Sequence, residues 1–516
     1  MPLAGPPLTI EVRISRLLDR GLAANPDAPA LVSREGQLTW QELDAVSTRV
    51  ARHYFTLGLK PGDRIATLMP NCAELVIHHI ACMKAGFAAT PLNYRYQAPE
   101  VDHALEVSGA SVLLHHAERE ADLALSKFAG MLSLGRISFG AADGREPSFE
   151  HFLQTEPPAV EVTPPTPDAV AFIFFTSGST GKPKGVTHSH RSFGSIVAST
   201  IAGFELNDAD VFLPATSYSH IAATHISFGA LAAGVRVEVP RRLDGDEMLP
   251  LLASTQPTFL CMLPAALFAL VRDHNATSEH FRSLRLCVSG GDKVSGELER
   301  EFTAIAGKAI DELYGMTETG MSTVNPPDGL NKVGSIGKLV AGYEGSIRDA
   351  AGAEVPLGGE GRLWIRSNAN MIGYWNRPDA TAETLVDGWL DTGDVVAADA
   401  DGYLWFRGRQ KQIIVHDGSN ITPQEIEESL LEHPAVAAVG VIGIHNLVHG
   451  ENVRAYVQLN PEATAPTAAE LIKFSRASVG YKAPEEIVFL DAMPLNATGK
   501  VDRAYLKETT RDSTAS

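Results

Sequence analysis

Apolar residues change between helical and extended spacing along the first part of the chain. In residues 10–25 and 40–57, apolar residues recur at the spacing of one helix face. Residues 63–69 form a short apolar run that is typical of a buried strand. Strand and helix patterns continue to alternate to about residue 137. This order predicts an α/β sheet with helices covering its faces.

The middle of the chain adds further strand patterns. Residues 169–175 are continuously apolar, residues 234–239 and 284–288 also favour strands, and residues 248–254 favour a helix. From about residue 334 to residue 409 the segments become shorter, and turn pairs such as Asp387-Gly388 and Asp401-Gly402 separate them. That spacing predicts antiparallel β structure.

A third pattern follows residue 409. Helices are expected over residues 424–433 and 468–478, and strands over 436–444 and 455–459, which together predict a small α+β unit. The length of 516 residues also favours more than one domain. We therefore expect an α/β fold with a large N-terminal domain over residues 1–409, containing α/β sheets and a β-rich subdomain, and a small C-terminal domain over 410–516.

Composition restricts the class of protein. A hydrophobic share of 44% with 20% charged residues is typical of a globular protein, and a net charge of −19 argues against nucleic-acid binding. The four cysteines form no C-x-x-C pair, so buried free thiols are expected. Neither a secretory start nor an apolar run long enough to span a membrane is recognised, so we expect a cytoplasmic enzyme.

A loop rich in glycine, hydroxyl and lysine residues follows the strand expected at residues 169–175. It reads Thr176-Ser177-Gly178-Ser179-Thr180-Gly181-Lys182-Pro183-Lys184. Glycines let backbone N–H groups approach an anion, while hydroxyls and lysines add donors and positive charge. The loop therefore predicts binding of a nucleotide polyphosphate. It is not a Walker A motif, because proline follows Lys182 and threonine stands at 176, where that motif needs glycine.

This loop resembles the phosphate loop of the acyl-adenylate-forming enzymes, which include acyl-CoA synthetases, peptide-synthetase adenylation domains and luciferases. Further motifs of that family follow in order as far as Lys500. Tyr314-Gly315-Met316-Thr317-Glu318 is similar to its aromatic-Gly-x-Thr-Glu motif. The resemblance implies that Tyr314 and Gly315 lie at the adenine, that Thr317 contacts the α-phosphate and that Glu318 binds Mg²⁺.

The remaining site residues also come from the resemblance. It implies that Gly290, Gly291 and Asp292 lie near the adenine and the acyl chain, and that Asp394 and Arg409 contact the ribose. Lys500 is implied to stabilise charge on phosphorus in the reaction. His220 is the candidate at the acyl pocket, with His225 as a nearby alternative.

The family chemistry has two half-reactions and needs ATP, Mg²⁺ and coenzyme A. A carboxylic acid and ATP give an acyl-adenylate and pyrophosphate, and the CoA thiol then displaces AMP. The resemblance implies that the small domain rotates about Lys411 between these steps. Gln412 stands where the family has an acidic residue, and Asp417 replaces a glycine near the thiol tunnel, so the thiol step is the less secure expectation.

Several alternatives stay open at this point. The acceptor of the acyl group can be CoA or the phosphopantetheine of an acyl carrier protein, and a homodimer is a further alternative. A luciferase-like oxygenase or an inactive nucleotide-binding module is less favoured. Near His220 no acidic residue stands to bind an amino group, and small residues line the expected pocket: Ala222, Ala223, Ala265, Ala266 and Gly290. Aryl, medium-chain and polycyclic acids all fit such a pocket.

Overall fold

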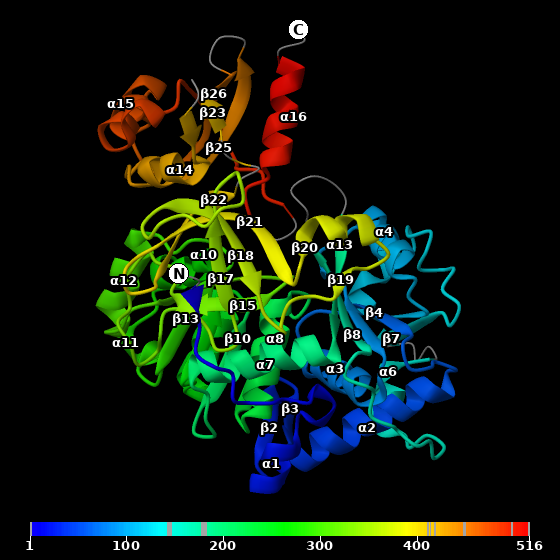
Figure 1. The fold of residues 1–516 in the computed structure, drawn as a ribbon. Coiled ribbons are helices and arrows are strands. Elements are labelled where there is room, and N and C mark those ends of the chain that lie inside the picture. The colour runs from blue at the N-terminus through cyan, green and yellow to red at the C-terminus, as the bar shows by residue number, and fades with distance from the viewer. Residues whose placement is uncertain are drawn as a thin grey trace. The chain divides into compact units, whose positions relative to one another are not determined.

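The structure is a computed structural model that describes residues 3–141, 147–176, 183–409, 412, 414–416, 419–446, 450–496 and 499–513 (Figure 1). The chain divides into two compact units, which we describe separately. The larger unit comprises Met1–Ser346, Trp364–Asp391 and Asp401–Tyr403. The smaller unit comprises Ile347–Leu363, Thr392–Ala400 and Leu404–Ser516. The expected boundary between residues 409 and 410 stays a prediction.

A seven-stranded sheet forms one part of the larger unit. Its strand order is β19 (Gly373–Tyr374), β9 (Lys184–Ser189), β8 (Val170–Thr176), β5 (Ala88–Pro91), β4 (Arg64–Leu68), β6 (Val112–His116) and β7 (Arg136–Phe139). Strands β8, β5, β4, β6 and β7 run parallel, whereas β9 is antiparallel to β8 and β19 is antiparallel to β9. In the sequence, the expected phosphate loop connects the antiparallel strands β8 and β9.

A nine-stranded sheet forms the other part of this unit. Its order is β16 (Lys338–Leu339), β15 (Gly320–Val324), β14 (Asp311–Met316), β13 (Leu286–Gly290), β12 (Phe259–Met262), β10 (Val211–Ala215), β11 (Arg236–Val239), β2 (Pro29–Ser33) and β3 (Gly36–Thr39). Strands from β14 to β2 run parallel, so their carboxyl ends share one edge of the sheet.

Helix α7 (His190–Phe204) packs against both sheets. Its Phe193 ring lies 4.5 Å from the Phe172 ring of β8, and its Phe204 ring lies 4.9 Å from the Phe259 ring of β12, between ring centroids. Ser189 begins the helix with a capping box. The other helices of this unit are α1 (Asp19–Ala24), α2 (Trp40–Thr56), α3 (Ala73–Ala85), α4 (Ala98–Ser108), α5 (Glu120–Leu123), α6 (Phe149–Gln154), α8 (Ile221–Ala232), α9 (Gly245–Thr255), α10 (Pro264–Arg272), α11 (Ser278–Phe281), α12 (Gly296–Ala306) and α13 (Pro378–Thr384).

The two sheets also meet near the carboxyl ends of β4 and β10. The Asn71 side chain, which follows β4, donates to the carbonyl oxygen of Thr216 at 2.9 Å and accepts from the backbone N–H of Tyr218 at 3.0 Å. Asn71 is buried, so both bonds are shielded from water. The loops that end these strands are thereby held side by side.

The expected antiparallel region contains a six-stranded sheet. Its order is β1 (Leu3–Ala4), β17 (Glu344–Arg348), β18 (Glu360–Arg366), β21 (Trp389–Ala398) and β20 (Leu385–Val386), with β22 (Leu404–Arg409) beside β21. The pairs β1–β17, β20–β21 and β21–β22 are antiparallel, as the short segments and turn residues predicted.

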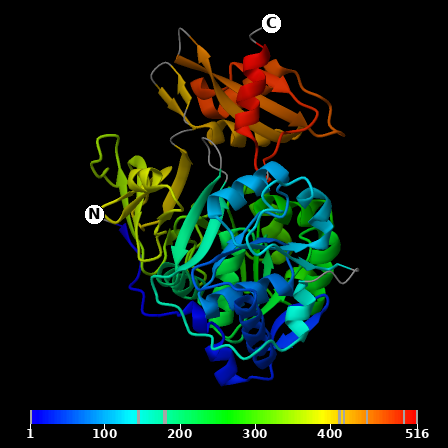
Figure 2. The ribbon, with the colours of Figure 1, turned by 90° about the vertical axis from the view of Figure 1, so that its right-hand side faces the viewer.

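The smaller unit contains the C-terminal α+β structure that the sequence predicted. Its sheet runs β24 (Ser419–Ile421), β23 (Ile414–His416), β26 (Gly450–Leu459) and β25 (Val436–Asn446), with β27 (Glu486–Phe489) beside β26. Helices α14 (Pro423–Leu431) and α15 (Ala468–Val479) bury Ile426 and Leu471 against Val441. Helix α16 (Arg503–Ser513) buries Leu506 against Ile442, on the opposite face (Figure 2). Successive side chains of β25 point to opposite faces of the sheet, so this strand contributes to the hydrophobic core on each face.

One expected helix is wrong. Residues 10–25 form a short 3₁₀ turn over Ile14–Arg16 and then helix α1, not one continuous helix. Ile14 and Leu18 are buried as their apolar character requires, but neither helical segment has a side-chain N-cap bond. A Cβ on Gly21 would lie 2.1 Å from the Trp40 ring, so tertiary packing decides the path of this segment. None of the helices in the described residues combines the length and apolar character that crossing a membrane requires.

Candidate active site

Two motifs are expected to contact the adenine, those of Gly290 and Tyr314. They lie on neighbouring strands of the nine-stranded sheet, at the same edge. Gly290, the last residue of β13, lies opposite Leu313 of the parallel neighbour β14. Gly291 and Asp292 therefore leave the sheet beside Tyr314, Gly315 and the turn that follows them. In parallel sheets, ligands bind at this carboxyl edge. Tyr314 is 9% exposed, and Asp292 is exposed.

The glycines at this edge allow close backbone packing. A Cβ on Gly290 would lie 2.7 Å from the carbonyl oxygen of Leu313, and a Cβ on Gly315 would lie 2.4 Å from that of Gly320. Gly291 has a φ of +81°, which favours glycine. The packing of the protein itself therefore requires glycine at 290 and 315, and the backbone conformation favours it at 291.

Thr317 and Glu318 occupy the turn between β14 and β15. The backbone N–H of Thr319 donates to the carbonyl oxygen of Met316 at 3.1 Å, which makes Thr317 and Glu318 the central residues of the turn. Thr317 is half-buried, and Glu318 is 7% exposed. The expected phosphate and metal residues are therefore adjacent on one short turn.

Two groups from β19 and the residues before it hold Glu318. The Tyr374 hydroxyl donates to Glu318 Oε1 at 2.8 Å, and the backbone N–H of Met371 donates to the Glu318 carbonyl oxygen at 2.7 Å. Burial and the neighbouring Glu318 charge raise the pKa of Tyr374 far above its usual range, so the phenol remains a donor. Since a carboxylate only accepts, this arrangement stabilises ionised Glu318.

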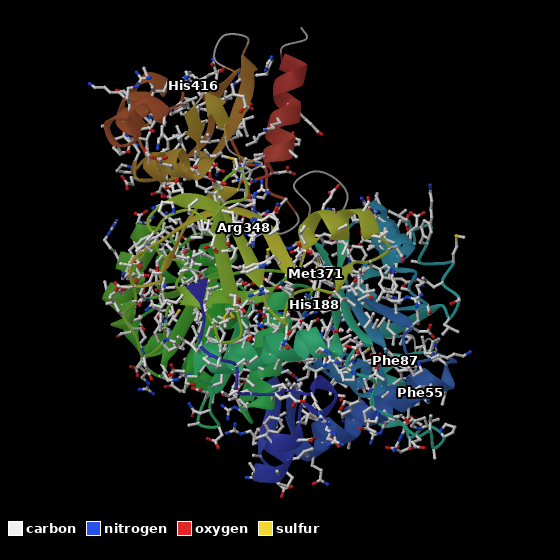
Figure 3. The ribbon with its side chains drawn as sticks, in the orientation of Figure 1. Phe55, Phe87, His188, Arg348, Met371 and His416 are labelled. Carbon is white, nitrogen blue, oxygen red and sulfur yellow. The ribbon has the colours of Figure 1, made fainter. Side chains whose placement is uncertain are left out.

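Strand β9 lies beside β19 and carries two more side chains of the site. Lys184 Nζ lies 4.6 Å from the centre of the Tyr374 ring. At the other end of the strand, His188 Nε2 lies 2.8 Å from the carbonyl oxygen of Thr317. Figure 3 labels His188 and Met371, which approach each other because Ile372 pairs with Thr187 through a 2.9 Å backbone bond.

Three residues beside the turn were not predicted from the sequence: His188, Met371 and Tyr374. His188 continues the strand after the phosphate loop, where side-chain alternation places it on the same face as Lys184. Tyr374 is separated from Glu318 by 56 positions, and only sheet pairing brings the two together. No motif spacing in one sequence contains that information.

The two candidate histidines of the acyl pocket have different environments. His220 is half-buried and stands at the N-cap position of α8. His225 is buried inside that helix, and its Nδ1 lies 2.9 Å from the Thr200 hydroxyl. Burial lowers the pKa of His225 to about 3. His225 is therefore a neutral core residue, and His220 remains the candidate.

The expected ribose pair lies in the β21–β22 hairpin of the smaller unit. Asp394 and Arg409 are direct cross-strand partners, and Arg409 Nε lies 3.1 Å from Asp394 Oδ1. The Asp394 side chain is 2% exposed, whereas that of Arg409 is 46% exposed. Thr392 fixes the strand by accepting from the backbone N–H of Asp394 at 3.1 Å. Residues 391–394 lie within β21, the first strand of this hairpin.

Lys500 stands on a tight turn of the smaller unit. Leu495 and Val501 form an antiparallel bridge, and Gly499 between them has a φ of +81°. The backbone N–H of Lys500 donates to Asn496 Oδ1 at 3.1 Å, and its carbonyl oxygen accepts from the Asn496 N–H at 2.8 Å. The turn fixes the backbone of Lys500 and leaves the residue exposed.

Part of the expected site lies outside the described residues: Ser177, Gly178, Ser179, Thr180, Gly181, Lys411 and Asp417. Thr176 and Lys184 are cross-strand partners in β8 and β9, so these two strands bracket the phosphate loop. Gln412 is described, and its Oε1 accepts from Gln424 Nε2 at 3.4 Å.

The donor set fits a magnesium nucleotide better than a protein-bound metal cluster. Within the part of the chain that the structure describes, no group of three His, Cys, Asp or Glu side chains could hold a metal ion. The Glu318 carboxylate supplies oxygen ligands of the kind that Mg²⁺ prefers, and the adjacent Thr317 hydroxyl can bond to a phosphate. Such an ion takes its remaining ligands from phosphate oxygens and water.

Comparisons with known proteins identify the family of the chain. The AMP-binding enzyme family matches residues 18–375, and the AMP-binding enzyme C-terminal domain matches residues 425–500. The chain is 33% identical to a fatty acid–[acyl-carrier-protein] ligase, ScoC, of Streptomyces coeruleorubidus, over 94% of this chain and 93% of that one. It is also 33% identical to a feruloyl-CoA synthase of an Amycolatopsis species, over 92% and 95% of the two chains.

A solved structure extends the likeness to the fold. ATP-bound MatB from Rhodopseudomonas palustris has a TM-score of 0.89 and 28% identity, with 96% of this chain and 99% of that chain covered. Nearly the whole length of each chain therefore takes part in the match. The chain belongs to the AMP-binding enzymes, within the acyl-adenylate-forming superfamily of acyl ligases that its motifs resemble.

Proposed function

We propose that this protein is an AMP-forming acyl-CoA synthetase. It converts a carboxylic acid and MgATP to an acyl-adenylate and pyrophosphate, and then transfers the acyl group to the thiol of CoA. The observation that carries the proposal is the turn of Thr317 and Glu318, where Tyr374 holds a buried carboxylate at the edge of a parallel sheet. This turn presents a hydroxyl and an anionic metal ligand next to each other.

In the first half-reaction, a carboxylate oxygen of the acid attacks the α-phosphorus of ATP, and the bond to pyrophosphate breaks. The Thr317 hydroxyl donates to the α-phosphate, and Glu318 holds Mg²⁺. When bound, Mg²⁺ neutralises phosphate charge. The Lys500 ammonium stabilises the charge that builds on the phosphorus oxygens.

Other residues bind the nucleotide. Asp394 accepts from the ribose hydroxyls while Arg409 orients its carboxylate. Tyr314 stacks on the adenine beside Gly290 and Gly291. The loop from Thr176 to Lys184 binds the β- and γ-phosphates through its backbone N–H groups, hydroxyls and lysines.

In the second half-reaction, the CoA sulfur attacks the acyl carbon and AMP leaves. The C-terminal domain rotates about Lys411 between the two half-reactions, which converts the adenylating arrangement into the thioester-forming one. His220 lines the acyl pocket. ATP and CoA are both supplied in the cytoplasm, so the proposed activity belongs to that compartment.

The test is a mass-spectrometric assay of the purified protein with MgATP, CoA and a mixed panel of carboxylic acids. Acyl-AMP and acyl-CoA are scored separately for every acid. We expect acyl-CoA from at least one acid, together with one pyrophosphate released per adenylate. Release of no pyrophosphate with any acid of the panel would reject the proposed function.

A carrier-protein ligase is the second candidate. Two observations favour it: a relative with 33% identity is a fatty acid–[acyl-carrier-protein] ligase, and Asp417 replaces a glycine near the expected thiol tunnel. The same assay with a phosphopantetheinylated acyl carrier protein in place of CoA separates the two. Acyl-AMP with acyl-carrier product and without acyl-CoA would favour this second candidate.

A further inference from the structure

The peptide that joins Thr317 to Glu318 is held by a side chain of β9. We propose that His188 is a positioning residue for Thr317 and Glu318: by binding the carbonyl oxygen of Thr317, it fixes the direction of the hydroxyl and the carboxylate during adenylation. This inference rests on the proposed function. It assigns a role to a histidine that lies outside every motif used above.

The turn geometry explains why this one carbonyl matters. In a four-residue turn the outer groups bond to each other, as Met316 and Thr319 do here, while the central peptide can point to either side. Type I and type II turns differ in the orientation of this central peptide. Glu318 does not have the positive φ that a type II turn requires, so the central peptide adopts one of the two orientations. His188 bonds to that orientation.

The hydrogen-bond partners of His188 define its tautomer. A carbonyl oxygen only accepts, so His188 Nε2 must carry the proton that is donated to Thr317 at 2.8 Å. Nδ1 is then an acceptor, and the Ser192 hydroxyl lies 3.3 Å from it. Burial lowers the pKa of His188 to about 4, so the ring is neutral at physiological pH. The imidazole is thereby oriented from both nitrogens.

Among the described residues, three hydrogen bonds hold this dipeptide. His188 of β9 holds the Thr317 carbonyl, the Met371 N–H holds the Glu318 carbonyl, and Tyr374 of β19 holds the Glu318 carboxylate. Because β9 and β19 are paired strands and Met371 lies just before β19, all three donors come from neighbouring segments. The bond from His188 is the one that determines where Thr317 points.

A buried histidine can also be a core residue without a role, and His79 supplies that comparison within the same unit. His79 is fully buried on α3, and its ring lies 5.5 Å from that of Phe172. Among the described residues, neither ring nitrogen of His79 has a hydrogen-bond partner. His188 and His79 therefore share burial and differ in their contact with the site.

The experiment compares His188→Leu and His188→Gln with His79→Leu and His79→Gln. Adenylation is measured by pyrophosphate exchange, with kcat, the KM for ATP and the Mg²⁺ requirement, and stability is measured by urea unfolding. We expect His188→Leu to lower kcat by ~10–100-fold and to raise the Mg²⁺ requirement, as loss of a residue that orients a metal ligand does. His188→Gln, which keeps a donor near the Nε2 position, should recover most of kcat.

The His79 variants should leave kcat and the Mg²⁺ requirement unchanged, because His79 makes no hydrogen bond to the turn among the described residues. Equal losses of kcat in His188→Leu and His79→Leu, or no recovery in His188→Gln, would overturn the positioning role. If the wild type forms no adenylate with any acid, the proposed function fails separately. The Mg²⁺ dependence of ATP binding by calorimetry then tests His188 in the same four variants, and an unchanged dependence in His188→Leu overturns the inference.

Discussion

Glu318 combines burial with a negative charge. A buried carboxylate needs donors to remain ionised, and the Tyr374 hydroxyl supplies one at 2.8 Å. Three segments contribute to a chain of polar contacts. The Glu318 carboxylate contacts the Tyr374 phenol, and the Lys184 ammonium lies over the Tyr374 ring. At the residue scale, this chain of polar contacts therefore ends at one acceptor, the Glu318 carboxylate.

Glu318→Gln should raise the Mg²⁺ concentration needed for half-maximal adenylation. The amide oxygen still accepts from Tyr374, so the fold is retained, but the charge that attracts the cation is lost. The measurement is the rate of pyrophosphate release across a Mg²⁺ titration, with urea unfolding as the control for stability. An unchanged Mg²⁺ titration would remove the metal role of Glu318.

Lys500→Ala should lower adenylate formation by ~10²–10³-fold while ATP affinity stays nearly unchanged, because the ammonium acts on charge that develops in the reaction. Single-turnover adenylation and equilibrium ATP binding measure the two effects. Lys473→Ala is the matched control, since Lys473 is an exposed lysine of the same unit on α15. A parallel loss of ATP affinity in Lys500→Ala would identify a binding residue instead.

At the element scale, β9 connects the phosphate loop to the turn of Thr317 and Glu318. Lys184 and His188 lie on one face of the strand because side chains alternate with a period of two. Gly185, between them, faces the opposite way. A Cβ there would lie 2.9 Å from Ile173 and 3.2 Å from Trp375.

Gly185→Ala should therefore destabilise the larger unit by ~1–3 kcal/mol, as overpacking of a buried site does. Adenylation should fall as well, because β9 carries both Lys184 and His188. Gly130→Ala is the control: its added Cβ would meet no atom within 4 Å. Urea unfolding of both variants checks the prediction, and equal stabilities would show that β9 can shift to accept the methyl group.

The elements that the sequence predicted well have strong periodic patterns with clear ends. The strand expected at 169–175 is β8 at Val170–Thr176, and the helix expected at 468–478 is α15 at Ala468–Val479, whose Thr467 forms a capping box. The helix expected at 10–25 fails because burial of Ile14 and Leu18 produces an apolar period without a cap to begin a helix.

The site could be predicted only where its residues belong to motifs. Gly290, Tyr314, Thr317 and Glu318 could be predicted as site residues because their motifs are short and local, and the structure brings them to one sheet edge. Tyr374 and His188 could not be found, since their contacts depend on which strands become neighbours. Strand pairing between distant segments is a tertiary property that local patterns do not contain.

At the scale of the whole molecule, buried neutral histidines make the larger unit sensitive to acid. Burial lowers the pKa of His79 to about 3 and that of His188 to about 4, below the ordinary 6.5. Above pH 6.5 the two histidines are neutral in both the folded and the unfolded chain. Their contribution to the free energy of unfolding is then fully present. As the pH falls, the unfolded chain binds protons first, and stability is lost until the pH reaches the folded pKa.

The free energy of unfolding should therefore fall between about pH 6.5 and pH 3, by ~1.4 kcal/mol for each unit of pKa difference as an upper limit. Urea unfolding at several pH values measures it. His79→Leu should flatten this dependence, because it removes one proton-binding group from the unfolded chain without removing a hydrogen bond of the described structure. An unchanged slope would show that other groups dominate acid unfolding.

Lys411→Pro tests the proposed two-step cycle of the whole molecule. Proline fixes φ and removes a backbone donor, so it should block a rotation about this residue. We expect near-normal adenylate formation and a loss of thioester formation, scored separately by mass spectrometry. Normal thioester turnover would reject Lys411 as the hinge.

The four cysteines, Cys72, Cys82, Cys261 and Cys287, are free and buried. Burial raises the pKa of each thiol, to about 12 at Cys261 and strongly at the other three. An acyl-adenylate is a mixed anhydride that acylates any sulfur nucleophile it meets. A protein of the proposed activity would generate this anhydride while its own cysteine thiols are protonated and enclosed, so burial protects these thiols from self-acylation and leaves the acyl group to the incoming acceptor.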